Sequence, residues 1–91
     1  MLMIVCELGG KDRDTQALET AIGAVGAATR AFRNTWLVDS LLTAPAAYNL
    51  LESSLDKAAG DRMLVIEVNP NNRQGWMPKP LWDFFGARAK A

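Results

Sequence analysis

Two carboxylates stand at the ends of expected strands and are the residues of this chain best placed to hold a divalent metal ion. Glu7 ends an apolar segment at the N-terminus, and Asp39 lies at the end of a segment rich in β-branched and aromatic residues. We expect these two strands to be parallel neighbours, so that both carboxylates lie at one edge of the sheet. Paired carboxylates suit Mg²⁺ or Mn²⁺, which take oxygen ligands and act on phosphoryl groups. In the alternative interpretation, both carboxylates meet solvent or pair with nearby lysine and arginine side chains.

Three arginines lie near aromatic residues along the chain and suggest a surface for nucleic acid. Arg30 and Arg33 flank Phe32, and Arg73 precedes Trp76. Basic side chains neutralise phosphates while aromatic rings stack on unpaired bases, so this combination is typical of proteins that bind single strands. The alternative is a set of scattered surface arginines without a common ligand.

The composition excludes several other chemistries. The chain has no histidine, so there is no imidazole base, no serine–histidine pair and no histidine metal ligand. The single cysteine, Cys6, excludes an internal disulfide and a zinc site built from thiolates alone. We expect Cys6 to pack as a small apolar residue.

The balance of charges limits the class of partner. Ten Lys and Arg residues balance ten Asp and Glu residues, so the formal net charge is zero. Holding duplex nucleic acid over the whole surface needs a clear basic excess, whereas a local basic patch does not. No apolar run approaches the ~20 residues that span a bilayer, and no basic segment precedes the N-terminal run. We therefore expect a cytoplasmic protein without a membrane partner.

The spacing of apolar residues predicts one domain over residues 1–91 with the order strand, helix, strand, strand, helix, strand. Helices are indicated by apolar residues at helical spacing that end at Gly26 and Gly60, and Thr43 is the expected cap of the second. Residues 27–32 either form a strand or extend the first helix, and we favour the strand. The expected strands are 1–8, 27–32, 35–40 and 63–68, and the expected helices are 15–26 and 43–60.

This order is that of the split βαβ, or ferredoxin-like, arrangement. It predicts an α+β fold, a βαββαβ sandwich with a four-stranded antiparallel sheet and two helices on one face, in which the first and third strands are central. Residues 73–91 are expected to form an appended arm, with a short helix that Pro80 opens.

Alternation divides each strand into two faces, and both faces are apolar. The residues expected to face the helices are Leu2, Ile4, Cys6, Leu8, Trp36, Val38, Leu64, Ile66 and Val68. The residues expected on the opposite face are Met3, Val5, Leu37, Met63 and Val65. A second apolar face on a small domain marks an interface, so we predict a homodimer through that face. Cover by the tryptophan-rich C-terminal segment is the alternative.

The middle and the end of the chain resemble the small SinR-family proteins. The resemblance rests on residues 34–38, residues 60–68 and the later pairs Gly75-Trp76 and Leu81-Trp82. SinR-family proteins are similar to the CRISPR-associated Cas-two family and, more distantly, to VapD-type toxins. The resemblance implies a ferredoxin-like fold and a homodimer.

The Cas-two family is associated with metal-dependent cleavage of RNA or DNA and with a scaffold role in spacer acquisition. Its characteristic residue is an aspartate that ends the first strand, and the matching position here is Glu7. A glutamate keeps the charge but moves it by one methylene, to which metal geometry is sensitive. We favour a non-catalytic dimeric module that binds a protein or a nucleic acid. The alternative is a Mg²⁺- or Mn²⁺-dependent endonuclease for single-stranded RNA or DNA, with Glu7 as catalytic residue and, together with Asp39, as metal ligand.

Overall fold

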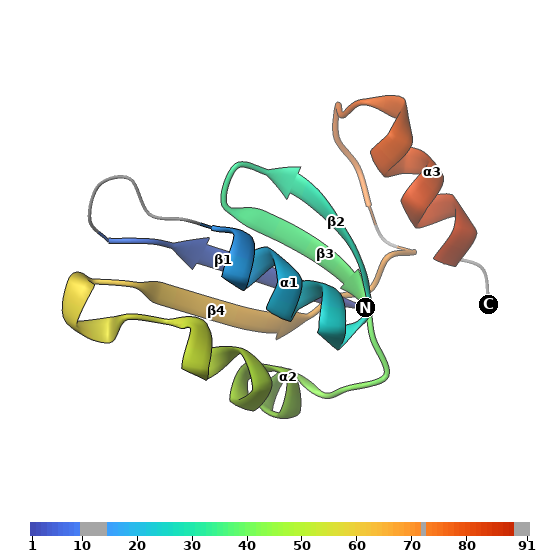
Figure 1. The fold of residues 1–91 in the computed structure, drawn as a ribbon. Coiled ribbons are helices and arrows are strands. Elements are labelled where there is room, and N and C mark those ends of the chain that lie inside the picture. Colours follow the sequence, from blue (N-terminus) through green and yellow to red (C-terminus); the bar gives the residue numbers. More distant parts are fainter. Residues whose placement is uncertain (10–14, 72, 89–91) are drawn as a thin grey trace.

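The computed structural model describes residues 1–9, 15–71 and 73–88, and its architecture is α+β. One four-stranded antiparallel sheet has the strand order β2-β3-β1-β4, which is compatible with a ferredoxin-like arrangement. The helices α1 and α2 lie across one face of this sheet (Figure 1). None of the helices in the described ranges is long and apolar enough to cross a bilayer. The elements are β1 (Leu2–Glu7), α1 (Gln16–Val25), β2 (Ala27–Phe32), β3 (Thr35–Asp39), α2 (Ala44–Leu51), the 3₁₀ turns η1 (Glu52–Ser54) and η2 (Lys57–Ala59), β4 (Arg62–Glu67) and α3 (Lys79–Arg88).

The two central strands, β1 and β3, are antiparallel, and the prediction that they are parallel was wrong. Leu2 lies opposite Val38, and Val5 lies opposite Thr35. A crossover through a helix joins parallel strands, so β1 is parallel to β2 and β3 is parallel to β4. The tight turn between β2 and β3 reverses the chain. The central pair must therefore run in opposite directions.

The first helix has nearly the predicted bounds. Leu18, Ile22 and Val25 are buried and form the apolar stripe that faces the sheet. Gly26 follows the helix at a point where the backbone passes close to the end of β3. A Cβ atom at Gly26 would lie 2.2 Å from the carbonyl oxygen of Asp39, so this close approach requires glycine.

The second helix is shorter than predicted. Thr43 caps it as expected, because its Oγ1 accepts a hydrogen bond from the Ala46 backbone N–H at 3.3 Å. The helix ends at Leu51, and two 3₁₀ turns replace the expected continuation to Gly60. The backbone N–H of Asp56 donates to Asp61 Oδ2 at 2.7 Å, a bond that holds this segment in turns.

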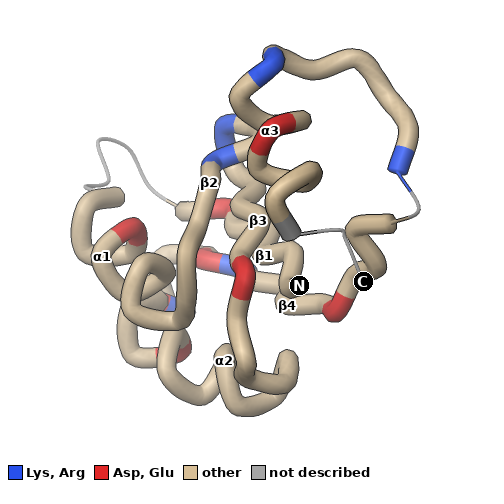
Figure 2. The backbone as a smooth tube through the Cα atoms, turned by 90° about the vertical axis from the view of Figure 1, so that its right-hand side faces the viewer, with Lys and Arg blue, Asp and Glu red and all other residues tan. Residues whose placement is uncertain are grey.

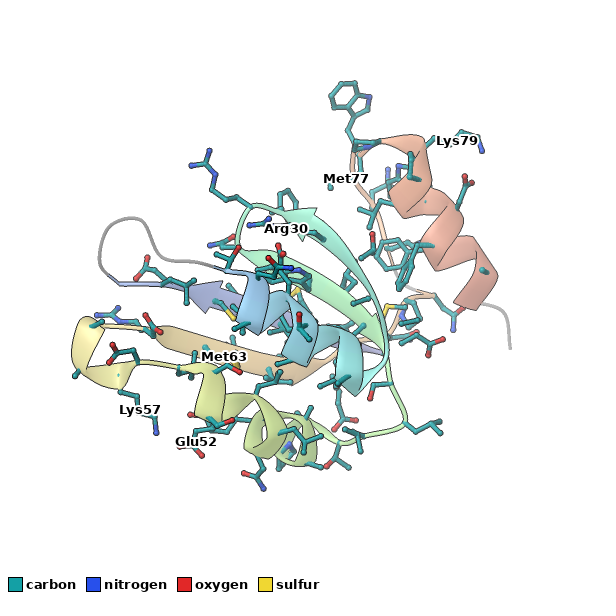
Figure 3. All side chains as sticks on the ribbon, in the orientation of Figure 1. Arg30, Glu52, Lys57, Met63, Met77 and Lys79 are labelled. Atoms are coloured by element: carbon teal, nitrogen blue, oxygen red, sulfur yellow. The ribbon has the colours of Figure 1, made fainter. Side chains whose placement is uncertain are left out.

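The two faces of β4 are the reverse of the predicted assignment. Met63 lies opposite Cys6 and Val65 opposite Ile4, and residues directly opposite in a sheet share a face. Met63 and Val65 therefore pack on the core beneath the helices, as the labelled Met63 shows in Figure 3. Leu64 and Ile66 take the open face instead. Every residue from 63 to 66 is apolar, so alternation alone could not choose between the two faces.

The C-terminal arm, described over residues 73–88, covers part of the open face of the sheet. Its helix α3 begins at Lys79, close to the predicted Pro80, and lies beyond β2, away from α1 and α2 (Figure 1). A cavity of about 440 Å³, which we call the arm pocket, separates arm residues such as Trp82 and Phe85 from Leu37 and Met3 of the sheet. Leu37 is buried there. The arm therefore covers the open face of the sheet at β3, as the alternative to a dimer predicted. It leaves the open face of β4 uncovered.

Candidate functional site

A pocket of about 410 Å³ opens at the end of β1, between α1 and the turn that joins β2 to β3. Cysteine, leucine and tryptophan side chains supply its apolar part, and one glutamate and two arginines supply its charged groups. Of the predicted site residues, it brings together Glu7, Arg30 and Arg33. We call it the hairpin pocket; it is lined by Cys6, Glu7, Leu8, Thr15, Leu18, Arg30, Arg33, Asn34 and Trp36.

The guanidinium group of Arg30 is fixed in position at this pocket. Its Cζ lies 4.9 Å from the ring centroid of Trp36, a cation–π contact. Its Nε donates to the Arg33 carbonyl oxygen at 2.9 Å, and Nη2 donates to the same oxygen. Nη1 forms an ion pair with Glu19 of α1 at 3.2 Å. Figure 3 shows Arg30 on the same side of the sheet as α1. These contacts hold the guanidinium group over the face of an aromatic ring.

A β-bulge places Arg30 on this side of the sheet. Phe32 lies opposite Thr35, but Arg30 lies opposite Trp36, so Ala31 is an extra residue in β2. Without the bulge, Arg30 would lie opposite Leu37 and point to the open face. The extra residue therefore brings Arg30 onto the helix side, above Trp36.

Arg33 occupies the turn and is exposed. Within the described ranges its side chain donates no hydrogen bond and forms no ion pair. In Figure 2, blue segments, which mark Lys and Arg, lie close together near the turn between β2 and β3. A guanidinium group in this state is available to an anion from solution.

Arg73 does not belong to this group, although the sequence placed it there. Its Nη1 donates to the Pro70 carbonyl oxygen at 2.7 Å, and its Cζ lies 5.4 Å from the ring centroid of Phe85. It lines the arm pocket instead of the hairpin pocket. The structure thus brings together two of the three predicted nucleic-acid-binding arginines.

Glu7 and Asp39 are far apart, so the predicted pair of metal ligands does not form within one chain. Asp39 lies one residue beyond Val38, the partner of Leu2, whereas Glu7 ends β1 opposite Arg62. At about 3.4 Å per strand residue, roughly 20 Å separate the two positions. No group of three or more acidic, cysteine or histidine side chains within the described ranges could hold a metal ion. These residues do not fit a shared Mg²⁺ or Mn²⁺, because each ligand must lie within about 2–2.6 Å of the ion.

The predicted dimer residues fall into three groups. Met3 and Val5 lie on the open face, where Val5 is opposite Leu64 and Met3 opposite Ile66. Leu37 lies under the arm, and Met63 and Val65 pack against the core. The uncovered part of the open face, which we call the open patch, consists of Val5, Leu64 and Ile66. Leu64 is 57% exposed and Ile66 is 44% exposed.

No known relative adds to this site. Neither family models nor curated proteins nor solved structures match the chain. The relationship to the SinR and Cas-two families therefore stays a prediction that rests on the quoted residues.

A buried carboxylate that the sequence did not single out holds the chain just after the residues of β1 that line the pocket. Asp61 is only 7% exposed. Its Oδ1 accepts from the Gly9 backbone N–H at 2.8 Å, and its Oδ2 accepts from that of Asp56 at 2.7 Å. This Asp61 bridge ties the segment after β1 to the segment before β4. A Gly-Asp pair just before a strand is the only sequence signal that could have indicated it.

Cys6 is an unreactive part of the pocket wall. Burial, with a smaller contribution from the negative charge of Asp61, raises the pKa of the Cys6 thiol from 9.0 to about 11. The thiolate is the nucleophilic form of cysteine, and at neutral pH almost none of it is present. The pocket therefore offers no cysteine nucleophile at neutral pH.

The raised pKa of Cys6 predicts a loss of stability at high pH. The unfolded thiol ionises near pH 9.0 and the folded thiol near pH 11, so its contribution is complete below pH 9 and declines as the pH rises toward 11. We expect the free energy of unfolding to fall by about 1–2 kcal/mol relative to Cys6→Ala over this interval. Urea unfolding of both proteins at a series of pH values measures the difference between their free energies of unfolding. Because the two proteins share all other titrating groups, the contributions of those groups cancel in this difference. Parallel curves for the two proteins would contradict the assignment.

Proposed function

We propose that this chain is a non-catalytic, homodimeric module of the ferredoxin-like, Cas-two type that binds single-stranded nucleic acid at the hairpin pocket. The observation that carries the proposal is the position of Arg33, whose side chain forms no hydrogen bond or ion pair among the described residues and which lies beside the Arg30–Trp36 contact. Trp36 is itself buried, so the planar surface that this site offers to a base is the guanidinium group of Arg30, and such groups stack on unpaired bases.

Charge and shape favour a single strand over a duplex. The net charge is zero, so the chain lacks the general basic excess that duplex binding over a wide surface requires. The charge of Arg30 is paired with Glu19, whereas the exposed charge of Arg33 stands beside an apolar lining and can meet one phosphate. Unpaired bases can use apolar and aromatic surface, whereas paired bases within a duplex are stacked on each other.

The non-catalytic part of the proposal is supported by the chemistry of the residues at the pocket. The chain has no histidine, and the thiol of Cys6 has a pKa of about 11. The register keeps Glu7 and Asp39 at opposite ends of the central strands. Within one protomer these residues supply no imidazole or thiolate base at neutral pH and no paired-carboxylate metal site.

The binding function predicts that Arg33→Gln weakens association with single strands. We expect about tenfold lower affinity, because one charge-assisted contact to phosphate is lost. The slope of log affinity against log salt should fall by about 0.7, which is the value for one phosphate contact to a single strand. Fluorescence anisotropy of labelled single-stranded RNA and DNA of about 12 nucleotides measures both quantities.

Arg73→Gln is the matched control, since Arg73 carries the same charge but lines the arm pocket. It should bind within about twofold of the wild type. Equal losses in both variants would mean that charge alone matters and would overturn the hairpin site. The same strands are incubated with Mn²⁺. Cleavage by the wild type that is lost in Glu7→Gln would replace the non-catalytic function with the nuclease alternative.

The homodimer is supported by the open patch. Val5, Leu64 and Ile66 form a contiguous apolar area on a sheet face where the arm covers only the strands nearer to β2. An apolar patch on one face of a small domain marks an association surface. A two-fold dimer would also double the number of hairpin pockets available to one strand and so raise its apparent affinity.

A further inference from the structure

We propose that the guanidinium group of Arg30 is a platform on which the hairpin pocket stacks one unpaired nucleobase, while Arg33 contacts the phosphate of the same nucleotide. This inference rests on the proposed function and names the unit of the strand that the pocket recognises. It assigns different chemical roles to two arginines that are only three residues apart.

The Arg30 group is ready to stack before any ligand arrives. One of its faces lies over Trp36 at 4.9 Å, and bonds to Arg33 and Glu19 fix its plane. Its side chain is still 42% exposed, so part of it remains open beside the pocket. Unstacked bases pack on the planes of arginine guanidinium groups as well as on aromatic rings. Because these contacts already restrain the group, less side-chain entropy is lost when a base binds.

The pocket has the size and the lining of a site for a small molecule. Its volume of about 410 Å³ lies within the ~300–1,000 Å³ range of such sites. Cys6, Leu8 and Leu18 supply apolar surface for the edge and face of a base. Arg33 stands at the turn, where a phosphate attached to that base can meet its exposed charge. One nucleotide can therefore place its base in the pocket and its phosphate at Arg33.

The β-bulge is the feature that makes the platform possible. Ala31 is the extra residue that moves Arg30 from the open face of the sheet to the helix side. Bulges often re-aim a side chain next to a functional site. The same irregularity leaves Phe32 on the open face, opposite Thr35. The bulge therefore puts Arg30 and Phe32 on opposite faces of the sheet.

The test compares a labelled oligonucleotide of about 12 nucleotides with an abasic backbone of the same length and charge. We expect the wild type to bind the base-containing strand about tenfold more tightly. Arg30→Lys keeps the charge but removes the planar group, so it should abolish the preference for the base-containing strand over the abasic strand. Arg33→Gln should weaken both strands equally, because it removes the phosphate contact. Circular dichroism and thermal unfolding check that both variants fold.

The possible failures are distinguishable. Equal binding of the two strands by the wild type would refute the base platform and leave the proposed binding function intact. No binding of either strand would overturn both. As an independent readout, adenosine monophosphate should shift the indole N–H resonance of Trp36, which lines the pocket, but not that of the exposed Trp76 on the arm. An unchanged Trp36 signal at saturating nucleotide would also refute the platform.

Discussion

Asp61→Ala is expected to lower the free energy of unfolding by about 3 kcal/mol. Each hydrogen bond to a charged group contributes about 1.5–3 kcal/mol, and Asp61 accepts two of them from backbone N–H groups. The substitution leaves the N–H groups of Gly9 and Asp56 without this partner in a region that is partly buried. A domain of this size is stabilised by about 5–14 kcal/mol in total, so the loss is a large fraction.

Two further variants make the Asp61 prediction specific. Asp61→Asn keeps a carbonyl oxygen but loses the charge and one acceptor, so we expect an intermediate loss of about 1–2 kcal/mol. Asp83→Ala removes a carboxylate from an exposed ion pair with Lys79 and should change stability by less than about 0.5 kcal/mol. Urea unfolding followed by circular dichroism ranks the three proteins. If Asp61→Ala unfolds together with Asp83→Ala, the Asp61 bridge contributes nothing to stability.

The sequence predicted elements better than it predicted how they pair. The stripe Leu18, Ile22 and Val25 and the cap at Thr43 are local signals, and the structure confirms both. The β2–β3 hairpin and the helix after Lys79 also follow from local residues. Such features depend on contacts within a few residues, so a single sequence contains most of the information that defines them.

The pairing of strands that are distant along the chain was harder to predict from the sequence. Whether Met63 or Leu64 faces the helices depends on the pairing of β4 with β1, and four consecutive apolar residues fit either choice. The direction of β3 beside β1 follows from the handedness of both crossovers taken together, and the error there placed Glu7 next to Asp39.

The candidate site was predicted in part for the same reason. Arg30 and Arg33 are near each other along the chain, so their common location was predictable, whereas Arg73 is distant and lies elsewhere. The contact of Arg30 with Trp36 depends on a bulge at Ala31. No pattern in the sequence predicts this bulge. A two-residue turn without the bulge would have put Arg30 on the other face.

Ile66→Asp is expected to convert the proposed homodimer into a monomer. The side chain lies on the open patch, opposite Met3 and two residues along β4 from Leu64, which pairs with Val5. A carboxylate there would have to leave water at the centre of an apolar interface without a partner. The dimer dissociation constant should rise on the order of a hundredfold, as at interface positions that dominate binding. The monomer itself should remain folded, because Ile66 is already 44% exposed within one chain.

Leu41→Asp is the matched control for Ile66→Asp, since it introduces the same charge at an exposed leucine outside the sheet. Leu41 is 105% exposed and lies in the loop between β3 and α2. Light scattering on a size-exclusion column should give about twice the monomer mass for the wild type and for Leu41→Asp at micromolar protein, and the monomer mass for Ile66→Asp. A wild-type monomer would refute the homodimer. A dimer that tolerates Ile66→Asp would place the interface elsewhere, with the arm and its exposed Trp76 as the next surface to substitute. Because the open patch and the hairpin pocket use different residues, Ile66→Asp should leave the intrinsic affinity for one nucleotide unchanged and lower only the gain from having two pockets.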